Sequence, residues 1–383
     1  MYMDNKILER SESILDKSSE LEHLHTFLNT PASMACTSQD SVLDLTMNQV
    51  WDICKNTGII QLRNLYPLDV VYKFAHNDGV GSSWQKHNEN FVNFIQKFRV
   101  NNIFEIGCGS GKLAEIYLDE NKKSKWYGLE PNYDYEKYKI KNFTLERSWF
   151  NSEYKLKDNY DAIVHSNIFE HSYNPIEFLQ TIRDNMDENA YHFISVPNLY
   201  SSLKNKFTNQ LNFEHTIFLT EDIIDILLKR VGFKIEEKIY NEGLPTIFYC
   251  CKKAEPYDIR FPKNVYKRNK KVFQDFVNYW KQEVDSINKK IDNFDGKIYL
   301  FGAHIFSQFL IYNGLNIKRV SGIIDNSKLK NKKRLYGTKF IVDYPNILDN
   351  KKDVVVILKT ANYADEIKKQ ILEEINSDVI FWS

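Results

Sequence analysis

The sequence lacks several features that would assign it to a class at once. Its 51 Lys and Arg residues are balanced by 51 Asp and Glu residues, so no net charge draws the chain toward nucleic acid or an anionic membrane. No apolar run approaches the roughly 18 residues that a membrane-spanning helix needs. The polar start, residues 1–10, contains no signal-peptide core. We therefore expect a globular, cytoplasmic protein with neither membrane insertion nor a nucleic-acid partner.

Cysteine is also scarce, and no Cys-x-x-Cys pair occurs among the five cysteines. An odd, scattered set fits a reducing compartment and excludes a disulfide framework. Cys54 opens a stretch that looks like half a zinc knuckle with Thr57 in place of its second cysteine. Cys36 and Cys54 with His23 or His25 are an alternative ligand set, but we expect buried thiols and no structural metal.

The most informative feature that is present is a short apolar run, residues 103–111, which ends in an acid and then in alternating glycines. Residues 100–106 are predicted to form a buried strand, and residues 112–118 to begin a helix. Glycines in the turn let the backbone bend sharply and approach a ligand that a Cβ atom would obstruct. The helix N-terminus behind the turn offers free N–H groups, so the stretch predicts a ligand-binding loop.

A second acid follows this loop at the end of the next predicted strand. Residues 125–129 are predicted to form the next strand, and Glu130 ends it about twenty residues after the loop, where a carboxylate can accept both ribose hydroxyls. The pattern Glu105-x-Gly107-x-Gly109-x-Gly111 resembles motif I of class I methyltransferases that depend on S-adenosylmethionine (SAM). The resemblance implies that the loop receives the amino-acid end of SAM. An empty doubly wound sheet is the alternative interpretation.

Later segments complete an α/β pattern. We expect the class I methyltransferase fold, a Rossmann-like, seven-stranded sheet whose antiparallel edge hairpin comes from residues 234–240 and 246–251. The loop 166–171, which follows the predicted strand 160–165, should lie over the cofactor. The predicted cofactor-binding residues are His87, Glu105, Gly107, Cys108, Gly109, Gly111, Glu130, Pro131, Trp149, Phe150 and Asn167.

Three of these assignments have a plain structural alternative. Trp149 and Phe150 stand where this fold usually holds adenine, and either ring can stack on the base or belong to the core. His87 lies in an amphipathic helix before the first strand, either at the edge of the cofactor cleft or facing solvent.

The chain is long enough for two or three domains. Its start is predicted to be helical, because Ile7, Ile14, Leu21, Leu24 and Phe27 fall near helical spacing. A basic run, residues 263–271, is a solvated face or a phosphate contact. The predicted parts are an N-terminal region (1–85), a SAM-binding domain (86–254), a linker helix (255–295) and a smaller Rossmann-like C-terminal domain that holds part of the substrate (296–383).

The order of motifs resembles the three-part sugar C-methyltransferases that act on nucleotide-linked deoxysugars. The matching positions are Trp84 to His87, Glu105 to Gly111, Glu130, Glu170-His171, Pro197-Asn198, Glu214-His215 and Gly302. The resemblance implies a zinc module, a SAM-binding domain and a Rossmann-like third domain. It also implies that Gly302-Ala303, Asp325-Asn326 and Gly337-Thr338 act around a nucleotide-linked sugar.

Two departures from that family affect the expected chemistry. The zinc knuckles are missing around Cys54, and Asn212-Phe213-Glu214-His215 stands where the relatives carry Tyr-His-Glu-His. The last histidine of that motif is implied as the base. SAM carries an activated methyl group, so the protein must align an acceptor and remove a proton, which suits a histidine. We therefore assign His215 as the base, Glu214 as an orienting carboxylate and His171 as a second polar contact; structural histidines are the alternative.

Loss of the tyrosine slightly favours methylation of a sugar hydroxyl over methylation of carbon, because carbon alkylation beside a keto group needs donors that stabilise an enolate. Tyr72, Tyr173 or Tyr200 are alternative donors. Some quinone O-methyltransferases bind a divalent metal with an acid and a histidine placed like Glu170-His171, but Asn167 stands where a second acid would help, so no metal is predicted. A quinone-like acceptor and a non-catalytic SAM-binding partner protein are the remaining alternatives.

Overall fold

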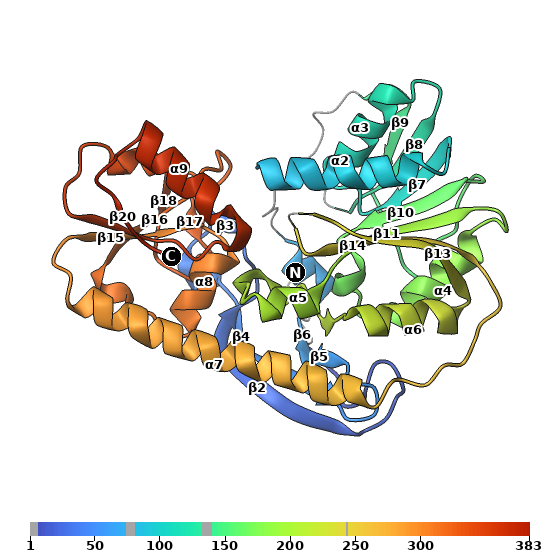
Figure 1. Ribbon diagram of the computed structural model, residues 1–383, viewed down its shortest axis with the longest axis horizontal. Coiled ribbons are helices and arrows are strands. Elements are labelled where there is room, and N and C mark those ends of the chain that lie inside the picture. The colour runs from blue at the N-terminus through green and yellow to red at the C-terminus, as the bar shows by residue number, and fades with distance from the viewer. Residues whose placement is uncertain (1–6, 74–80, 132–139, 243) are drawn as a thin grey trace.

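The computed structural model describes residues 7–73, 81–131, 140–242 and 244–383. Figure 1 shows two α/β sheets with one long helix, α7 (Asn264–Asp292), running along both. The larger sheet has the strand order β13-β14-β11-β10-β7-β8-β9. Its parallel strands are β7 (Asn102–Ile106), β8 (Lys125–Leu129), β9 (Phe143–Glu146), β10 (Ala162–Ser166) and β11 (Tyr191–Pro197).

The edge of this sheet is antiparallel. β14 (Thr246–Lys253) pairs with β11, and β13 (Phe233–Tyr240) pairs with β14. The predicted Rossmann-like, seven-stranded sheet with an antiparallel edge hairpin is therefore confirmed. Periodicity alone located its strands well, because buried parallel strands read as short continuous apolar runs.

Helices cover both faces of the larger sheet. α2 (Ser82–Gln96) and α3 (Lys112–Glu120) pack on one face, and α4 (Pro175–Asn185) and α6 (Glu221–Val231) pack on the other. Local chemistry sets their ends. The side chain of Asn174 accepts the N–H of Glu177 at the start of α4, and α6 stops at Gly232, whose φ is +97°. The short helix α5 (Leu199–Lys204) follows β11.

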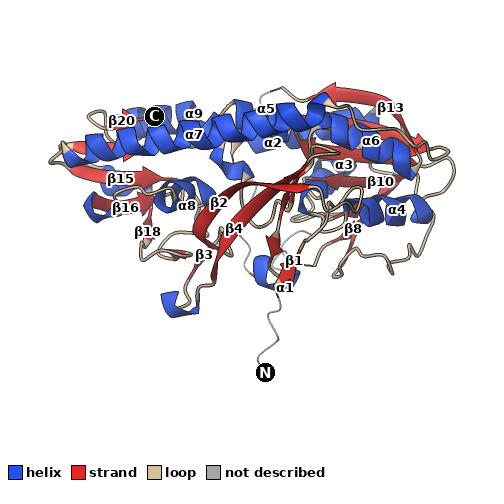
Figure 2. Cartoon of the chain, turned by 90° about the horizontal axis from the view of Figure 1, so that it is seen from below, coloured by secondary structure: helices blue, strands red, loops and turns tan. Residues whose placement is uncertain are grey.

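The N-terminal region is built from strands, so the predicted helical opening is wrong. β2 (Leu21–Pro31) pairs antiparallel with β4 (Thr46–Cys54), and Figure 2 shows the pair as a long curved ribbon. The sheet order is β12 (Ile217–Phe218), β5 (Ile60–Leu62), β4 and β2. The apolar residues are spaced as in a helix. Pairing with β4, however, supplies hydrogen-bond partners for the backbone along the segment and buries Phe27. A tertiary partner overrode the local pattern.

Short pairings tie the N-terminal region to the other two domains. β5 (Ile60–Leu62) pairs with β12 (Ile217–Phe218) of the middle domain. β3 (Cys36–Thr37) pairs with β17 (Arg334–Leu335) of the C-terminal domain. The remaining N-terminal elements are β1 (Leu8–Glu9), β6 (Asn64–Leu65) and α1 (Leu68–Val71). Cys36 and Cys54 are buried thiols in different surroundings, as expected.

The C-terminal domain holds the second sheet, which is parallel in the order β18-β16-β15-β19-β20. Its strands are β15 (Lys297–Phe301), β16 (Val320–Ile324), β18 (Val342–Asp343), β19 (Val354–Ile357) and β20 (Ile380–Trp382), with helices α8 (Ile305–Tyr312) and α9 (Ala364–Glu374). The smaller Rossmann-like unit is thus present.

The long helix α7 carries the basic run, and at least three of its cations are paired with acids. Arg268, Lys270 and Lys271 form ion pairs with Asp222, Glu22 and Asp275. The opposite stripe of α7, which includes Phe276 and Trp280, is buried. None of the described helices combines the length and the apolar composition that crossing a bilayer requires.

Two histidines are buried side by side in the core of the larger sheet. His165 on β10 and His192 on β11 have ring centroids 5.1 Å apart. Among the described residues, none bonds to either ring nitrogen of either histidine. Burial lowers the pKa of His165 to about 3 and the pKa of His192 well below its ordinary value. Both rings are therefore neutral in the folded protein at neutral pH.

This pair predicts a loss of stability in mild acid. The folded pKa values lie below the unfolded value near 6.5, so the stabilising contribution is fully present above about pH 6.5 and is lost as the pH falls toward 3. The free energy of unfolding should drop by about 1.4 kcal/mol per pH unit for each histidine. Urea titrations at pH 7.5 and 5.5 measure this. His165→Leu and His192→Leu should flatten the pH dependence, whereas His23→Gln, on an exposed side chain, should not; an equal slope in all four proteins would contradict the assignment.

Candidate active site

The glycine loop has the backbone geometry that its sequence predicts. Gly107, Gly109 and Gly111 all have positive φ, at +69°, +52° and +72°, a region that side chains other than glycine rarely adopt. A Cβ atom on Gly107 would lie 2.3 Å from Ile168 Cδ1. A Cβ atom on Gly109 would meet no atom of the described chain within 4 Å, so this turn faces open space.

Glu130 holds that open turn from the neighbouring strand. The N–H of Gly109 donates to Glu130 Oε2 over 3.0 Å. Both residues stand at the carboxyl ends of parallel strands, where ligands of open α/β sheets bind. Glu130, Gly107, Pro131, Trp149 and Phe150 line one cavity of about 490 Å³. The structure thus brings five of the predicted cofactor residues together.

The same cavity fits the parts of SAM. The turn at Gly109 leaves open space with no side chain in the way, so a ligand can approach the backbone there, although the N–H of Gly109 already donates to Glu130. The carboxylate of Glu130 suits ribose hydroxyls. Trp149, with 42% of its surface exposed, and Phe150 offer rings to a base.

Other predicted cofactor residues lie behind the loop. Glu105 is buried, accepts the indole N–H of Trp126 over 2.8 Å, and does not line the cavity. Burial raises the pKa of Glu105 to about 8. Cys108 is also buried and packs where Gly128 has no side chain. Glu105 and Cys108 therefore pack beneath the loop, in the protein interior, and do not line the cavity.

His87 and Asn167 need a correction of place. His87 is buried between α2 and the sheet, with Nε2 3.3 Å from Ser195 Oγ and 3.4 Å from Ser166 Oγ, and it lines neither cavity described in this section. Burial lowers its pKa to about 4. The sequence placed it correctly before the first strand but not its side chain, which turns inward. Asn167, with φ +53°, lines a second cavity rather than the first.

This second cavity, of about 190 Å³, is formed by all three parts of the chain. The N-terminal region gives Met34, and α2 gives Trp84. The middle domain gives amide side chains, and the C-terminal domain gives His304 and Tyr363. His171 and Glu214 line both cavities and so mark the boundary between them. The sequence predicted that the C-terminal domain holds part of the substrate, but it did not single out His304 and Tyr363, because no local pattern reports how two domains meet.

His171 stands at this boundary with polar partners on both sides. It ends the 3₁₀ turn Phe169–His171 that follows β10. Its Nδ1 bonds to the hydroxyl of Tyr72 and lies 3.8 Å from Glu214 Oε2, and its Nε2 lies 3.6 Å from Glu170 Oε1. Tyr72, one of three tyrosines considered from sequence, is thus the one that reaches this histidine.

His215 faces His171 across the boundary, with ring centroids 5.0 Å apart. Its Nδ1 lies 2.9 Å from the carbonyl oxygen of Gln210. A carbonyl only accepts, so Nδ1 carries the proton and Nε2 keeps a lone pair. Burial, followed by the nearby His171, lowers the pKa of His215 to about 4, against the opposing charge of Glu170. The ring is therefore neutral at neutral pH, with a free lone pair at Nε2, and is a weaker base than an unperturbed imidazole.

Asn212 shapes the loop that carries these groups. Its Oδ1 accepts the N–H groups of Glu214 and His215 over 2.8 and 2.9 Å. The side-chain oxygen of Asn212 is therefore used by the backbone of this loop. This contact explains why a short amide is suited to the position.

One group of ligand atoms is close enough to hold a metal ion. An atom each from Glu170, His171 and His215 lies within 4.8 Å of the others. The sequence predicted no metal, and that prediction stays open to the chelation test given under the proposed function.

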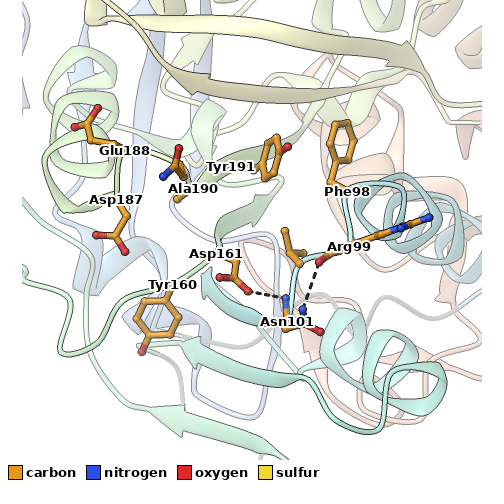
Figure 3. A pocket seen from close by; sticks show the side chains of 11 residues that line it. Phe98, Arg99, Asn101, Tyr160, Asp161, Asp187, Glu188, Ala190 and Tyr191 are labelled. Carbon is orange, nitrogen blue, oxygen red and sulfur yellow. Dashed lines mark hydrogen bonds between the residues drawn. The ribbon is translucent and has the colours of Figure 1, made fainter.

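A larger hollow of about 640 Å³, shown in Figure 3, lies at the opposite end of the strands. Arg99, Asp161 and Glu188 are among its walls, and Asp161 Oδ2 accepts the N–H groups of Asn101 and Asn102. The carboxylate of Asp161 therefore closes the turn before β7. Because ligands of this fold bind at the carboxyl ends of the strands, we do not assign the site there.

Comparison with known proteins identifies the class of the middle domain. Residues 85–238 match the family model described as a methyltransferase domain. No curated protein matches the sequence. Together with the strand order and the loop, the match makes the middle of the chain a class I SAM-dependent methyltransferase domain, with SAM as its cofactor.

Three solved structures illustrate the likeness. The plantazolicin methyltransferase BpumL in complex with SAH shares 15% identity, with a TM-score of 0.35, over 45% of this chain and 84% of that one. An S-adenosylmethionine dependent methyltransferase from Listeria monocytogenes shares 13%, with a TM-score of 0.37, over 44% and 99%. One from Clostridium acetobutylicum shares 12%, with a TM-score of 0.37, over 45% and 92%.

The cofactor cavity predicts a specific binding defect. Glu130→Ala should weaken SAM binding roughly ten- to a hundredfold, the loss expected for charge-assisted hydrogen bonds to ribose, while the fold stays intact. Titration calorimetry with SAM measures the affinity, and circular dichroism checks the fold. Glu115→Ala, on the exposed side of α3 and paired with Lys112, is the control. Wild-type affinity in Glu130→Ala would remove this residue from the ribose site.

Proposed function

We propose that the chain methylates a hydroxyl group of a nucleotide-linked sugar. The product would serve the biosynthesis of a surface polysaccharide, such as a capsule or O-antigen, or of a glycoside. The observation that carries this proposal is the boundary between the two cavities. His171 and Glu214 line both, so an acceptor in the second cavity would face the cofactor cavity across them.

The walls of the second cavity support a sugar as acceptor. Its polar lining includes the amides of Asn167, Asn209 and Gln210, and amides both donate and accept hydrogen bonds as hydroxyl groups do. Aromatic rings from Trp84, Phe207 and Tyr363 add apolar surface. No lysine or arginine occurs among its described lining residues. This chemistry suits a neutral, hydroxyl-bearing group.

The C-terminal domain supports an acceptor larger than one ring. His304 follows β15, and Ala361 and Tyr363 follow β19, so the second sheet presents its carboxyl ends to the same cavity. Those ends are where open α/β sheets bind ligands. An acceptor with a nucleotide would extend onto this domain. A small quinone-like acceptor would not need it.

The residues divide the work as follows. When bound, SAM supplies a methyl group already activated by its positively charged sulfur. Gly107 and Glu130 would hold the cofactor. As the acceptor oxygen takes the methyl group, His215 would take the hydroxyl proton at Nε2 while Nδ1 stays bonded to Gln210 O. Glu170 and Glu214 lie close enough to stabilise the imidazolium that forms. His171 positions the acceptor at the boundary.

Carbon methylation of a nucleotide-linked keto-deoxysugar is the second candidate. Tyr72 favours it, because its hydroxyl reaches the boundary at His171 and a phenol can stabilise an enolate. Hydroxyl methylation stays slightly favoured, because the loop position that holds the tyrosine in the C-methylating relatives is Asn212, whose Oδ1 accepts two backbone N–H groups.

One assay decides between these acceptors. The protein is incubated with carbon-labelled SAM and a panel of nucleotide-linked hexoses, heptoses and keto-deoxysugars, and the products are read by mass spectrometry and carbon NMR. A labelled carbon near the methoxy region means oxygen methylation, and one in the aliphatic region means carbon methylation. No product from any sugar would overturn the proposal and leave the quinone-like acceptor or a non-catalytic partner protein.

Removing the base should separate turnover from binding. His215→Ala and His215→Gln should lower kcat by about 10²- to 10⁴-fold, the usual contribution of a general base, and keep SAM affinity within a few fold. Steady-state assays on the acceptor found in the panel give kcat, and calorimetry gives affinity. His23→Ala, on an exposed strand position, is the control. Near-normal kcat in both His215 variants would end its role as base.

The predicted absence of a metal can be tested directly. Exhaustive treatment with EDTA, followed by assay in metal-free buffer, should leave full activity, because proton removal by His215 needs no Lewis acid. Elemental analysis of the treated protein confirms removal. Activity that is lost and then restored by a divalent cation would instead assign Glu170, His171 and His215 as ligands.

A further inference from the structure

The start of the described chain contacts the loop after β10 and the loop before β12, which carry His171 and His215. β1 (Leu8–Glu9) pairs antiparallel with β6, and the N–H of Arg10 then donates to the carbonyl of Arg63 over 2.8 Å. This short pairing delivers the Arg10 side chain to the segment that precedes β12. No sequence pattern marked Arg10, because its partners are backbone carbonyls far along the chain.

The guanidinium of Arg10 bonds to two separate loops. Its Nη1 donates to the carbonyl oxygens of Thr216, over 2.7 Å, and Leu62, over 3.3 Å. Its Nη2 donates to the carbonyl of Tyr173 over 2.8 Å and to Thr216 Oγ1 over 3.3 Å. Burial lowers the pKa of Arg10 to about 10, so the group stays charged at neutral pH.

These acceptors lie next to the two histidines. Thr216 directly follows His215, and Tyr173 stands two residues after His171. Thr216 also donates its hydroxyl to Ser172 O over 2.6 Å and its N–H to Glu170 O over 3.2 Å. Arg10 and Thr216 therefore join the loop after β10 to the loop before β12.

Arginine suits this junction better than any other cation. Its planar fork fixes several N–H donors in one plane, so it can hold carbonyls from two loops at a set separation. A lysine ammonium is a point charge on a flexible stem and cannot span the same set. Loss of the guanidinium would remove its bond to the carbonyl of Tyr173, whereas Thr216 O would keep the N–H of Leu62 as a donor.

We propose that Arg10 is a positioning residue that fixes the separation of His171 and His215 across the boundary of the two cavities. This inference rests on the proposed function, in which those histidines face the acceptor. It makes the N-terminal region part of the active site. Arg10 lines neither cavity and acts through the backbone of the two loops.

Hydrogen exchange measured by mass spectrometry on the full chain tests this coupling without any acceptor. In Arg10→Lys and Arg10→Met, amide exchange in residues 166–173 and 211–217 should rise together, by about tenfold or more, while affinity for SAH by calorimetry stays within threefold. Arg63→Lys is the matched control. Arg63 is the arginine whose carbonyl accepts the Arg10 N–H, but its own side chain pairs with Asp52. In the Arg63→Lys variant, residues 166–173 and 211–217 should exchange as in the wild type.

Turnover supplies the second readout. With the acceptor from the panel, kcat should fall at least tenfold in both Arg10 variants, with KM for SAM within threefold. Wild-type exchange in both loops, or loosened loops with unchanged kcat, would overturn the proposal. If Arg10→Met does not fold, Thr216→Val removes the shared hydroxyl and should give a smaller rise in the same two loops. If no acceptor is methylated, the proposed function fails, while the exchange data still decide whether Arg10 couples the loops.

Discussion

The structure depends on one constraint, that parallel strands end at the same edge of a sheet. β7, β8 and β10 are neighbours, so the glycine loop, Glu130 and the turn that carries His171 meet although they are far apart in the chain. A seven-stranded sheet with helices on both faces supplies the rigidity that holds them. The cofactor cavity is the direct result of this meeting, and the second cavity is added by the domains on either side.

The middle domain could be predicted from its sequence because its signals are local. Apolar runs, the glycines and Glu130 indicate strands, a turn and a ligand contact within a few residues of each other. The side chains of Glu105 and His87 could not be placed in the same way. Both stand in predicted elements, but their directions depend on which face the sheet buries, and the structure turns both inward.

The remaining features depend on contacts between distant segments. β2 looked helical because its partner, β4, lies beyond a turn, and the pairing of β5 with β12 leaves no trace in either short segment. The walls of the second cavity that Trp84, His304 and Tyr363 form arise where three parts of the chain meet. Long-range pairing of this kind decides strand formation more than intrinsic preference does. The motif order found the catalytic histidine candidates, but only the structure shows that His171 and His215 face each other.

A crystal structure of the full chain with SAH tests the central claim most directly. The account predicts the ribose hydroxyls on Glu130, the amino-acid end at Gly107 and Gly109, and the sulfur turned toward His171 and Glu214, where the two cavities meet. SAH bound at the opposite end of the strands, or with its sulfur turned away from that boundary, would contradict the account.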